Sequence, residues 1–117
     1  HRREIASIYA SNLDEKIQSK DYVDNINLSS CLRFPIFVEK RQILVNYLKE
    51  KGIFVSDIWY DAPIAPSKLL SKTDYNAECH FSEKVSKKIL NLPTHINVSR
   101  KQAEYISKEI NKWLNTK

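Results

Sequence analysis

The sequence predicts an α/β fold, in which helices cover one face of a small three-stranded sheet. Runs of apolar residues at helical spacing alternate with short runs of strand composition, in the order α-β-α-β-α-β-α. A chain of 117 residues suits a single domain and can bury about two-thirds of the surface that it exposes when unfolded. Since three short strands cannot carry helices on both faces, we expect the second face to meet water or another domain.

The first half of the chain predicts two helices and the strand between them. Apolar residues recur at helical spacing over residues 2–16 and again over residues 40–51, where Gly52 supplies the left-handed position that often ends a helix. Residues 32–38 have strand composition. Pro35 cannot donate to a ladder hydrogen bond, so this strand is expected at an edge or locally irregular.

The middle of the chain predicts a second strand and a long loop. Residues 53–60 alternate between apolar and polar side chains until the pattern breaks near Asp57. Residues 61–81 contain two prolines and show no long periodicity, which predicts an extended loop. Loops of this length within a compact domain are uncommon and often functional.

The last third predicts a short helix, a third strand and a final helix. Ser82 is the expected cap of a helix over residues 83–88, and residues 89–93, "ILNLP", form the strand, with Leu90 and Leu92 facing the helices. Ser99 and the glutamine three residues later make a capping-box pattern at the start of the final helix. The expected buried stripe of this helix is Ala103, Ile106, Ile110, Trp113 and Leu114.

Charge and cysteine content limit the function classes. The net charge of +5 is spread along the chain, so we expect a solvated surface and no nucleic-acid partner. No apolar run approaches the ~20 residues of a membrane span. Cys31 and Cys79 follow no C-x-x-C spacing, which predicts reduced thiols in a cytoplasmic protein. His80 adjoins Cys79 but has no further ligands at suitable spacing, so we expect no metal site.

The chain contains no methionine and opens within a predicted helix without a capping residue. We therefore expect it to be a piece of a longer protein, with removal of a leader as the alternative.

Four stretches, in this order, resemble the C-terminal small domain of the DegT/StrS-type aminotransferases. "RREIASIYASNL" is similar to the helix that leaves the large domain, with its R-x-x-x-A-x-x-Y-x-x-x-L pattern. "LRFPIFVEKRQILVNYLKEKGI" resembles the strand-helix-glycine unit, and "WYDAPIAPS" resembles the Y-x-x-P-hydrophobic-H loop. "FSEKVSKKILNLPTHINVSRKQAEYI" resembles the A-E-x-x-S…L-x-L-P-x-H segment and the last helix.

The resemblance implies the small domain of a pyridoxal-phosphate enzyme, spanning residues 1–117, whose N-terminal large domain is missing. Relatives mostly aminate keto groups of nucleotide-linked sugars and commonly pair as homodimers. Their Schiff-base lysine and cofactor-holding groups belong to the large domain, so we expect no cofactor in this segment and no catalysis by it alone. Ser82 and Ala65 depart from the family pattern; where many relatives carry a histidine this chain has Ala65, which weakens the usual sugar assignment.

Five residues are candidate substrate contacts, because they are polar or aromatic and lie at expected strand ends or in the loop that follows. Each has a structural alternative: Arg33 in a surface or interdomain salt bridge, Asp57 as a turn cap, and His95 bonded to backbone. Two aromatic residues could stack on a sugar or base, or could simply form core and rim. The five are Arg33, Asp57, Trp59, Tyr60 and His95, with no catalytic residue and no metal ligand among them.

A free-standing basic module that binds nucleic acid or a protein partner is the alternative function. It predicts that five basic residues gather into one patch and that association depends steeply on salt. These residues are Lys84, Lys87, Lys88, Arg100 and Lys101.

Overall fold

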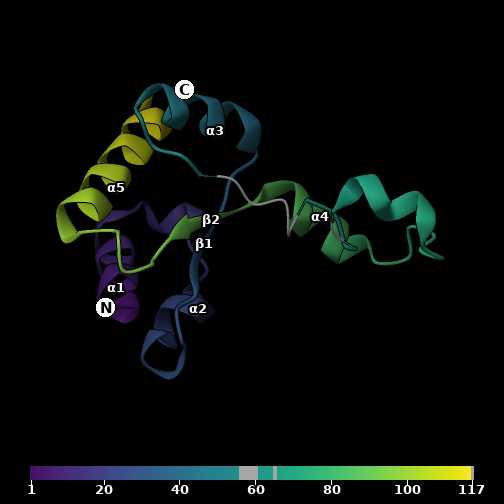
Figure 1. The fold of residues 1–117 in the computed structure, drawn as a ribbon, viewed down its shortest axis with the longest axis horizontal. Coiled ribbons are helices and arrows are strands. Elements are labelled where there is room, and N and C mark those ends of the chain that lie inside the picture. The colour runs from purple at the N-terminus through teal and green to yellow at the C-terminus, as the bar shows by residue number, and fades with distance from the viewer. Residues whose placement is uncertain (56–60, 65, 117) are drawn as a thin grey trace.

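The computed structural model describes residues 1–55, 61–64 and 66–116, and within them it forms a mixed α/β fold around a two-stranded sheet (Figure 1). Strands β1 (Arg33–Phe37) and β2 (Ile89–Pro93) pair antiparallel, with Phe34 opposite Leu92. The predicted fold class is confirmed. Two of the three expected strands are present at the expected places.

One face of this sheet belongs to the core and the other does not. Phe34 and Ile36 of β1 are fully buried, as are their partners Leu92 and Leu90 of β2. This confirms the expected burial of the two leucines. On the opposite face, the side chains of β1 and β2 are mostly exposed or only partly covered, so the sheet has a single helix-covered face as expected.

Three helices form the covering layer. Helix α1 (Arg2–Asn12) packs against β1 and against α5 (Arg100–Asn115), which also contacts α3 (Arg41–Glu50). Figure 1 shows α5 running beside α1 and up to α3, on the side of the sheet away from α4. The helices and the sheet together bury one continuous apolar core.

Helix α5 follows the sequence prediction closely. The Ser99 hydroxyl accepts the backbone N–H of Gln102 while the Gln102 side chain accepts that of Ser99, so both halves of the capping box form. The predicted stripe is buried, with Leu114 partly covered at its end. Gly52, at the end of α3, has φ +75°, the left-handed conformation expected of it.

The first helix is shorter than the predicted range of residues 2–16. It ends at Asn12, where Leu13 is extended, and Asp14 then caps a separate 3₁₀ turn over Glu15–Ile17. The side-chain amide of Gln18 donates to the carbonyls of Ala10 and Leu13, which satisfies acceptors that the helix end leaves free. A local cap therefore outweighs the continuing apolar periodicity.

The predicted strand over residues 53–60 is wrong for its first part. Ile53 and Val55 are buried and Phe54 is 75% exposed, so the alternation correctly reports burial. Residues 53–55 nevertheless belong to no strand, because they pair with no ladder. Residues 56–60 lie outside the described part of the chain.

The predicted extended loop over residues 61–81 is also corrected. It contains a 3₁₀ helix, Ser67–Lys72, and α4 (His80–Lys88) begins within it. The N-cap of α4 is Cys79, whose carbonyl accepts the Glu83 N–H, so Ser82 lies inside the helix and is not its cap. In Figure 1 this arm, residues 61–64 and 66–88, extends away from the body.

The base of the arm is anchored to α3. The guanidinium of Arg41 donates to the carbonyls of Ser86 and Ile89, and Glu39 forms an ion pair with Lys88.

A further short helix, α2 (Lys20–Asp24), was not predicted from the sequence and is capped by the Ser19 hydroxyl.

Candidate functional site

The start of β1 and the end of β2 meet at one end of the sheet. Arg33, the first residue of β1, pairs with Pro93, the last residue of β2. His95 follows two residues later, and both Arg33 and His95 are exposed. The antiparallel register thus brings together two candidate residues that are 62 positions apart in the sequence.

Buried hydroxyl groups hold the backbone at this end. The hydroxyl of Tyr9 on α1 donates to the Pro93 carbonyl at 2.9 Å, and burial raises the pKa of Tyr9 above its usual value. The Thr94 hydroxyl lies 2.6 Å from the Cys31 carbonyl and 3.0 Å from that of Leu32. Tyr9 and Thr94 are fully buried, so the "LPTH" segment is anchored up to the residue before His95.

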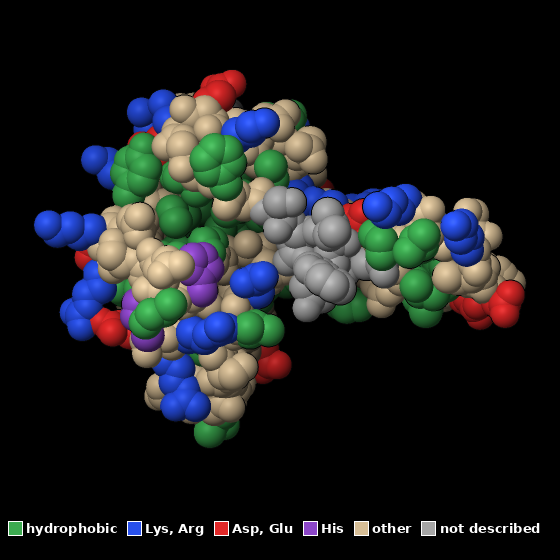
Figure 2. Space-filling model, in the orientation of Figure 1, with side chains coloured by type: hydrophobic (Ala, Val, Ile, Leu, Met, Phe, Trp, Pro, Cys, Tyr) green, Lys and Arg blue, Asp and Glu red, His purple; other side chains and the backbone are tan. Residues whose placement is uncertain are grey.

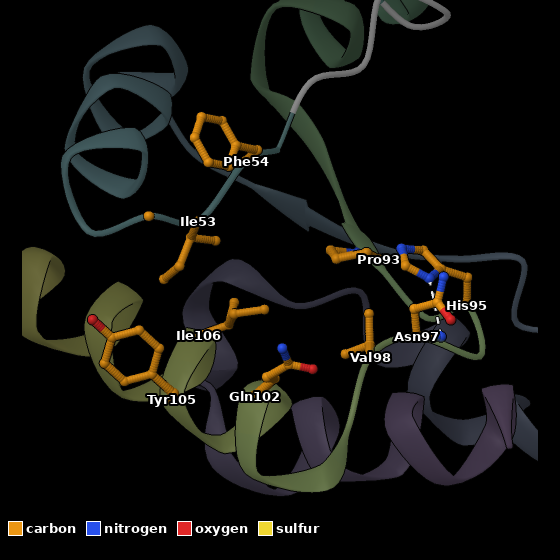
Figure 3. Close-up of a pocket in the computed structure, with 10 residues that line it drawn as sticks. Ile53, Phe54, Pro93, His95, Asn97, Val98, Gln102, Tyr105 and Ile106 are labelled. Carbon is orange, nitrogen blue, oxygen red and sulfur yellow. Dashed lines mark hydrogen bonds between the residues drawn. The ribbon is translucent and has the colours of Figure 1, made fainter.

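His95 lies at the surface and makes local contacts. Its Nδ1 accepts the backbone N–H of Asn97 at 3.3 Å, shown as a dashed line in Figure 3. Its carbonyl lies 3.1 Å from Nε2 of His1. The bond from Asn97 ties the imidazole to the backbone, the arrangement that the structural alternative for His95 describes.

Arg33 is held by its backbone. The Tyr22 hydroxyl donates to the Arg33 carbonyl, and burial, followed by a hydrogen bond with Cys31, raises the pKa of Tyr22 to about 12. Within the described part of the chain, no ion pair engages the Arg33 side chain. Its guanidinium therefore stands in solvent at the end of the sheet, where it can meet an anionic group.

Two recesses open on the two sides of His95. The first, of about 320 Å³, lies between the loop after α3, the end of β2 and α5 (Figure 3). Its floor is apolar, and the amides of Asn97 and Gln102 lie at its edge, a composition typical of small-molecule sites. Phe54 and Tyr105 stand on the two sides of Ile53 in Figure 3.

The second recess, of about 480 Å³, lies beside the first turn of α1. Figure 2 shows basic side chains next to the histidines on this side of the body. Its arginines are not among the candidates predicted from the sequence, where the available signal was Arg2, which opens the R-x-x-x-A-x-x-Y pattern. The recess is lined by His1, Arg2, Arg3, Ser30, His95 and Ile96.

Three candidate residues cannot be placed. Asp57, Trp59 and Tyr60 lie outside the described residues, as does Ala65, the departure from the family pattern. Their assignment as substrate contacts stays a prediction.

The residues that line the two recesses are not the set of groups that binds pyridoxal phosphate. That cofactor requires a lysine amine, a carboxylate for the pyridine nitrogen and donors for its phosphate. Neither recess is lined by a lysine or by a carboxylate. The single glycine, Gly52, ends a helix and opens no phosphate loop. The linings of the two recesses therefore supply neither the lysine nor the carboxylate that the chemistry of this cofactor requires.

The described residues show neither a metal-binding cluster nor a membrane-spanning helix. They contain no group of three potential metal-ligating side chains, and none of their helices has the length and apolarity needed to cross a bilayer. Both cysteines are free, with Cys31 buried and Cys79 exposed, and their reduced state stays a prediction.

The two recesses therefore lie at one end of a helix-covered sheet, where α1 and α5 supply lining residues. The chain matches the model of the DegT/DnrJ/EryC1/StrS aminotransferase family over residues 1–111. It therefore belongs to that family, as the resemblance of its four stretches implied. A search of curated proteins found no match.

Proposed function

We propose that this chain is the C-terminal small domain of a pyridoxal-phosphate-dependent aminotransferase that aminates a keto sugar linked to a nucleotide. The observation that carries the proposal is the family match over residues 1–111 together with the exposed pair Arg33 and His95 beside two recesses. The family accounts for the reaction class, and the recesses account for a surface that faces substrate.

In this proposal the domain binds and orients substrate and contributes no catalytic residue. Arg33 offers a guanidinium suited to a negatively charged substrate group, and His95 lies between the recesses. Asp57, Trp59 and Tyr60 supply polar and stacking contacts from the loop that follows. The large domain holds the cofactor and its lysine, and the complete enzyme is a cytoplasmic homodimer of polysaccharide or secondary-metabolite biosynthesis.

The test uses the complete protein that contains this chain. We expect it to bind pyridoxal phosphate and to transfer an amino group from an amino-acid donor to a nucleotide-linked keto sugar. Mass spectrometry of the product measures this transfer. Arg33→Gln should raise KM for the sugar about tenfold, the cost of one lost charge-assisted hydrogen bond. Lys101→Gln removes an equal charge from the exposed start of α5 and should leave KM unchanged.

Two results would contradict the proposal. One is a complete protein that takes up the cofactor but aminates no nucleotide-linked sugar. The other is a protonated Schiff-base absorbance band when the 117-residue chain alone is mixed with pyridoxal phosphate, because this would place the reactive lysine within it.

The free-standing basic module finds no support in the arrangement of its five residues. Lys84, Lys87 and Lys88 lie on α4, whereas Arg100 and Lys101 lie at the start of α5. Figure 1 places these two elements on opposite sides of the sheet, so the charges form two separate groups. A steep salt dependence of nucleic-acid binding is accordingly not expected.

A further inference from the structure

The recess beside the first turn of α1 carries positive charge without acidic neighbours in its lining. Two guanidinium groups, a serine hydroxyl and two imidazoles border it, and no carboxylate does. The nearby acid of the first turn is Glu4, and it forms an ion pair with Arg100. The charge of Glu4 is therefore compensated outside the recess.

The two guanidinium groups are available to a ligand. Arg3 donates from Nε to the Ser29 carbonyl at 2.9 Å, which holds its guanidinium at the edge of the recess and occupies only one of its three nitrogens. Arg2 is partly buried and makes no hydrogen bond or ion pair with any residue that the structure describes. A half-covered guanidinium without a partner retains its full capacity for an anion.

We propose that this recess binds a phosphate group, and that the group is the diphosphate of a nucleotide-linked substrate, an identification that rests on the proposed function. Planar guanidinium groups match phosphate oxygens with paired hydrogen bonds, and the Ser30 hydroxyl can add another. The adjoining 320 Å³ recess shares His95 and offers aromatic rings and side-chain amides, which suit the nucleobase of the same ligand.

The test titrates the 117-residue chain, which has its own apolar core, with inorganic pyrophosphate while backbone amide NMR shifts are recorded. The amino terminus is acetylated so that its charge does not contribute. We expect the largest shifts at residues 2, 3, 30 and 96. Arg2→Gln should weaken binding about tenfold, as expected for the loss of one charge-assisted hydrogen bond. The exposed-charge control Lys101→Gln should change the affinity less than about twofold, since Lys101 does not line the recess and salt screens an exposed surface charge.

Equal weakening by Arg2→Gln and Lys101→Gln, or shifts spread evenly over the chain, would overturn the assignment of this recess. A nucleoside diphosphate should bind more tightly than pyrophosphate, and equal affinities would overturn the nucleotide as ligand. Failure of the two proposals can be told apart. If the complete enzyme is an active aminotransferase but the 117-residue chain binds no pyrophosphate, only this inference is contradicted. If the chain binds pyrophosphate but the complete protein has no aminotransferase activity, only the proposed function is contradicted.

Discussion

The hydroxyl of Tyr9 should stabilise the fold by holding the end of β2. Tyr9→Phe removes this one oxygen, which is buried and donates to the Pro93 carbonyl at 2.9 Å. The ring and its packing against Phe34, with centroids 5.4 Å apart, stay in place. The substitution therefore isolates the cost of leaving a covered carbonyl without its partner, about 1–2 kcal/mol in the free energy of unfolding.

This loss is large enough to measure in a domain of this size. An unfolding entropy of about 2.1 cal/mol/K per residue gives roughly 0.25 kcal/mol/K for 117 residues, so the midpoint should fall by about 4–8 °C. Urea titration followed by circular dichroism measures the free energy, and a thermal scan measures the midpoint. Tyr105→Phe is the matched control, because Tyr105 is 43% exposed and its hydroxyl makes no hydrogen bond with the described residues.

Tyr105→Phe should stay within about 0.5 kcal/mol of the parent. A Tyr9→Phe cost no larger than this would refute the stabilising role of the Tyr9 hydroxyl. Such a result would mean that water replaces the lost hydroxyl at the Pro93 carbonyl. The "LPTH" segment would then depend on packing alone for its position beside the recesses.

Two further predictions concern the ends of α3 and β1. Gly52→Ala should lower the free energy of unfolding by about 1 kcal/mol, because a residue with a Cβ is strained at φ +75°. A steric clash is not the cause, since no atom lies within 4 Å of the new methyl group. An unchanged urea midpoint would refute the backbone explanation. Ionisation of Tyr22 should lower the stability of the fold above pH 10, because the folded-state pKa of about 12 exceeds the unfolded value of 10.0. The contribution of Tyr22 to the free energy of unfolding is complete below pH 10 and is lost as the pH rises toward 12. The stability advantage of the parent over Tyr22→Phe should therefore shrink between pH 10 and 12 in urea titrations, and an advantage independent of pH would contradict this.

Local signals in the sequence were sufficient for the elements whose determinants lie close together. The capping box of α5 needs only Ser99 and Gln102, and the positive φ of Gly52 needs only the absence of a Cβ. The apolar composition of β1 and β2 predicted both strands, and Leu90 and Leu92 predicted the buried face of β2. Each of these features depends on interactions within a few residues or on burial alone.

Other elements depend on partners that the sequence does not reveal. At the end of α1, Gln18 folds back onto two carbonyls. Helix α4 begins after Cys79, which makes no side-chain cap hydrogen bond, and not at the more obvious serine. The alternation at residues 53–55 reported burial correctly but could not say whether a ladder partner would be present. Periodicity records which side chains are buried and not what the backbone bonds to.

The candidate site divides in the same way. The chemistry of Arg33 and His95 and their places at expected strand ends indicate a site. Arg2 and Arg3 lie within a helical pattern that gives no sign that they would line a recess. Only the fold of the chain brings the first turn of α1 beside His95, and only the ion pair between Glu4 and Arg100 leaves the charge of that recess uncompensated.

By itself, therefore, the sequence determined the family, the fold class, the buried faces and the local caps, because these follow from residue types at short spacing. The tertiary structure decided which carbonyls and charges find partners across the chain, and through them the position of the two recesses. The physical reason is that a hydrogen bond or ion pair between distant residues leaves no periodic trace along the chain, although its geometry determines what the surface can bind.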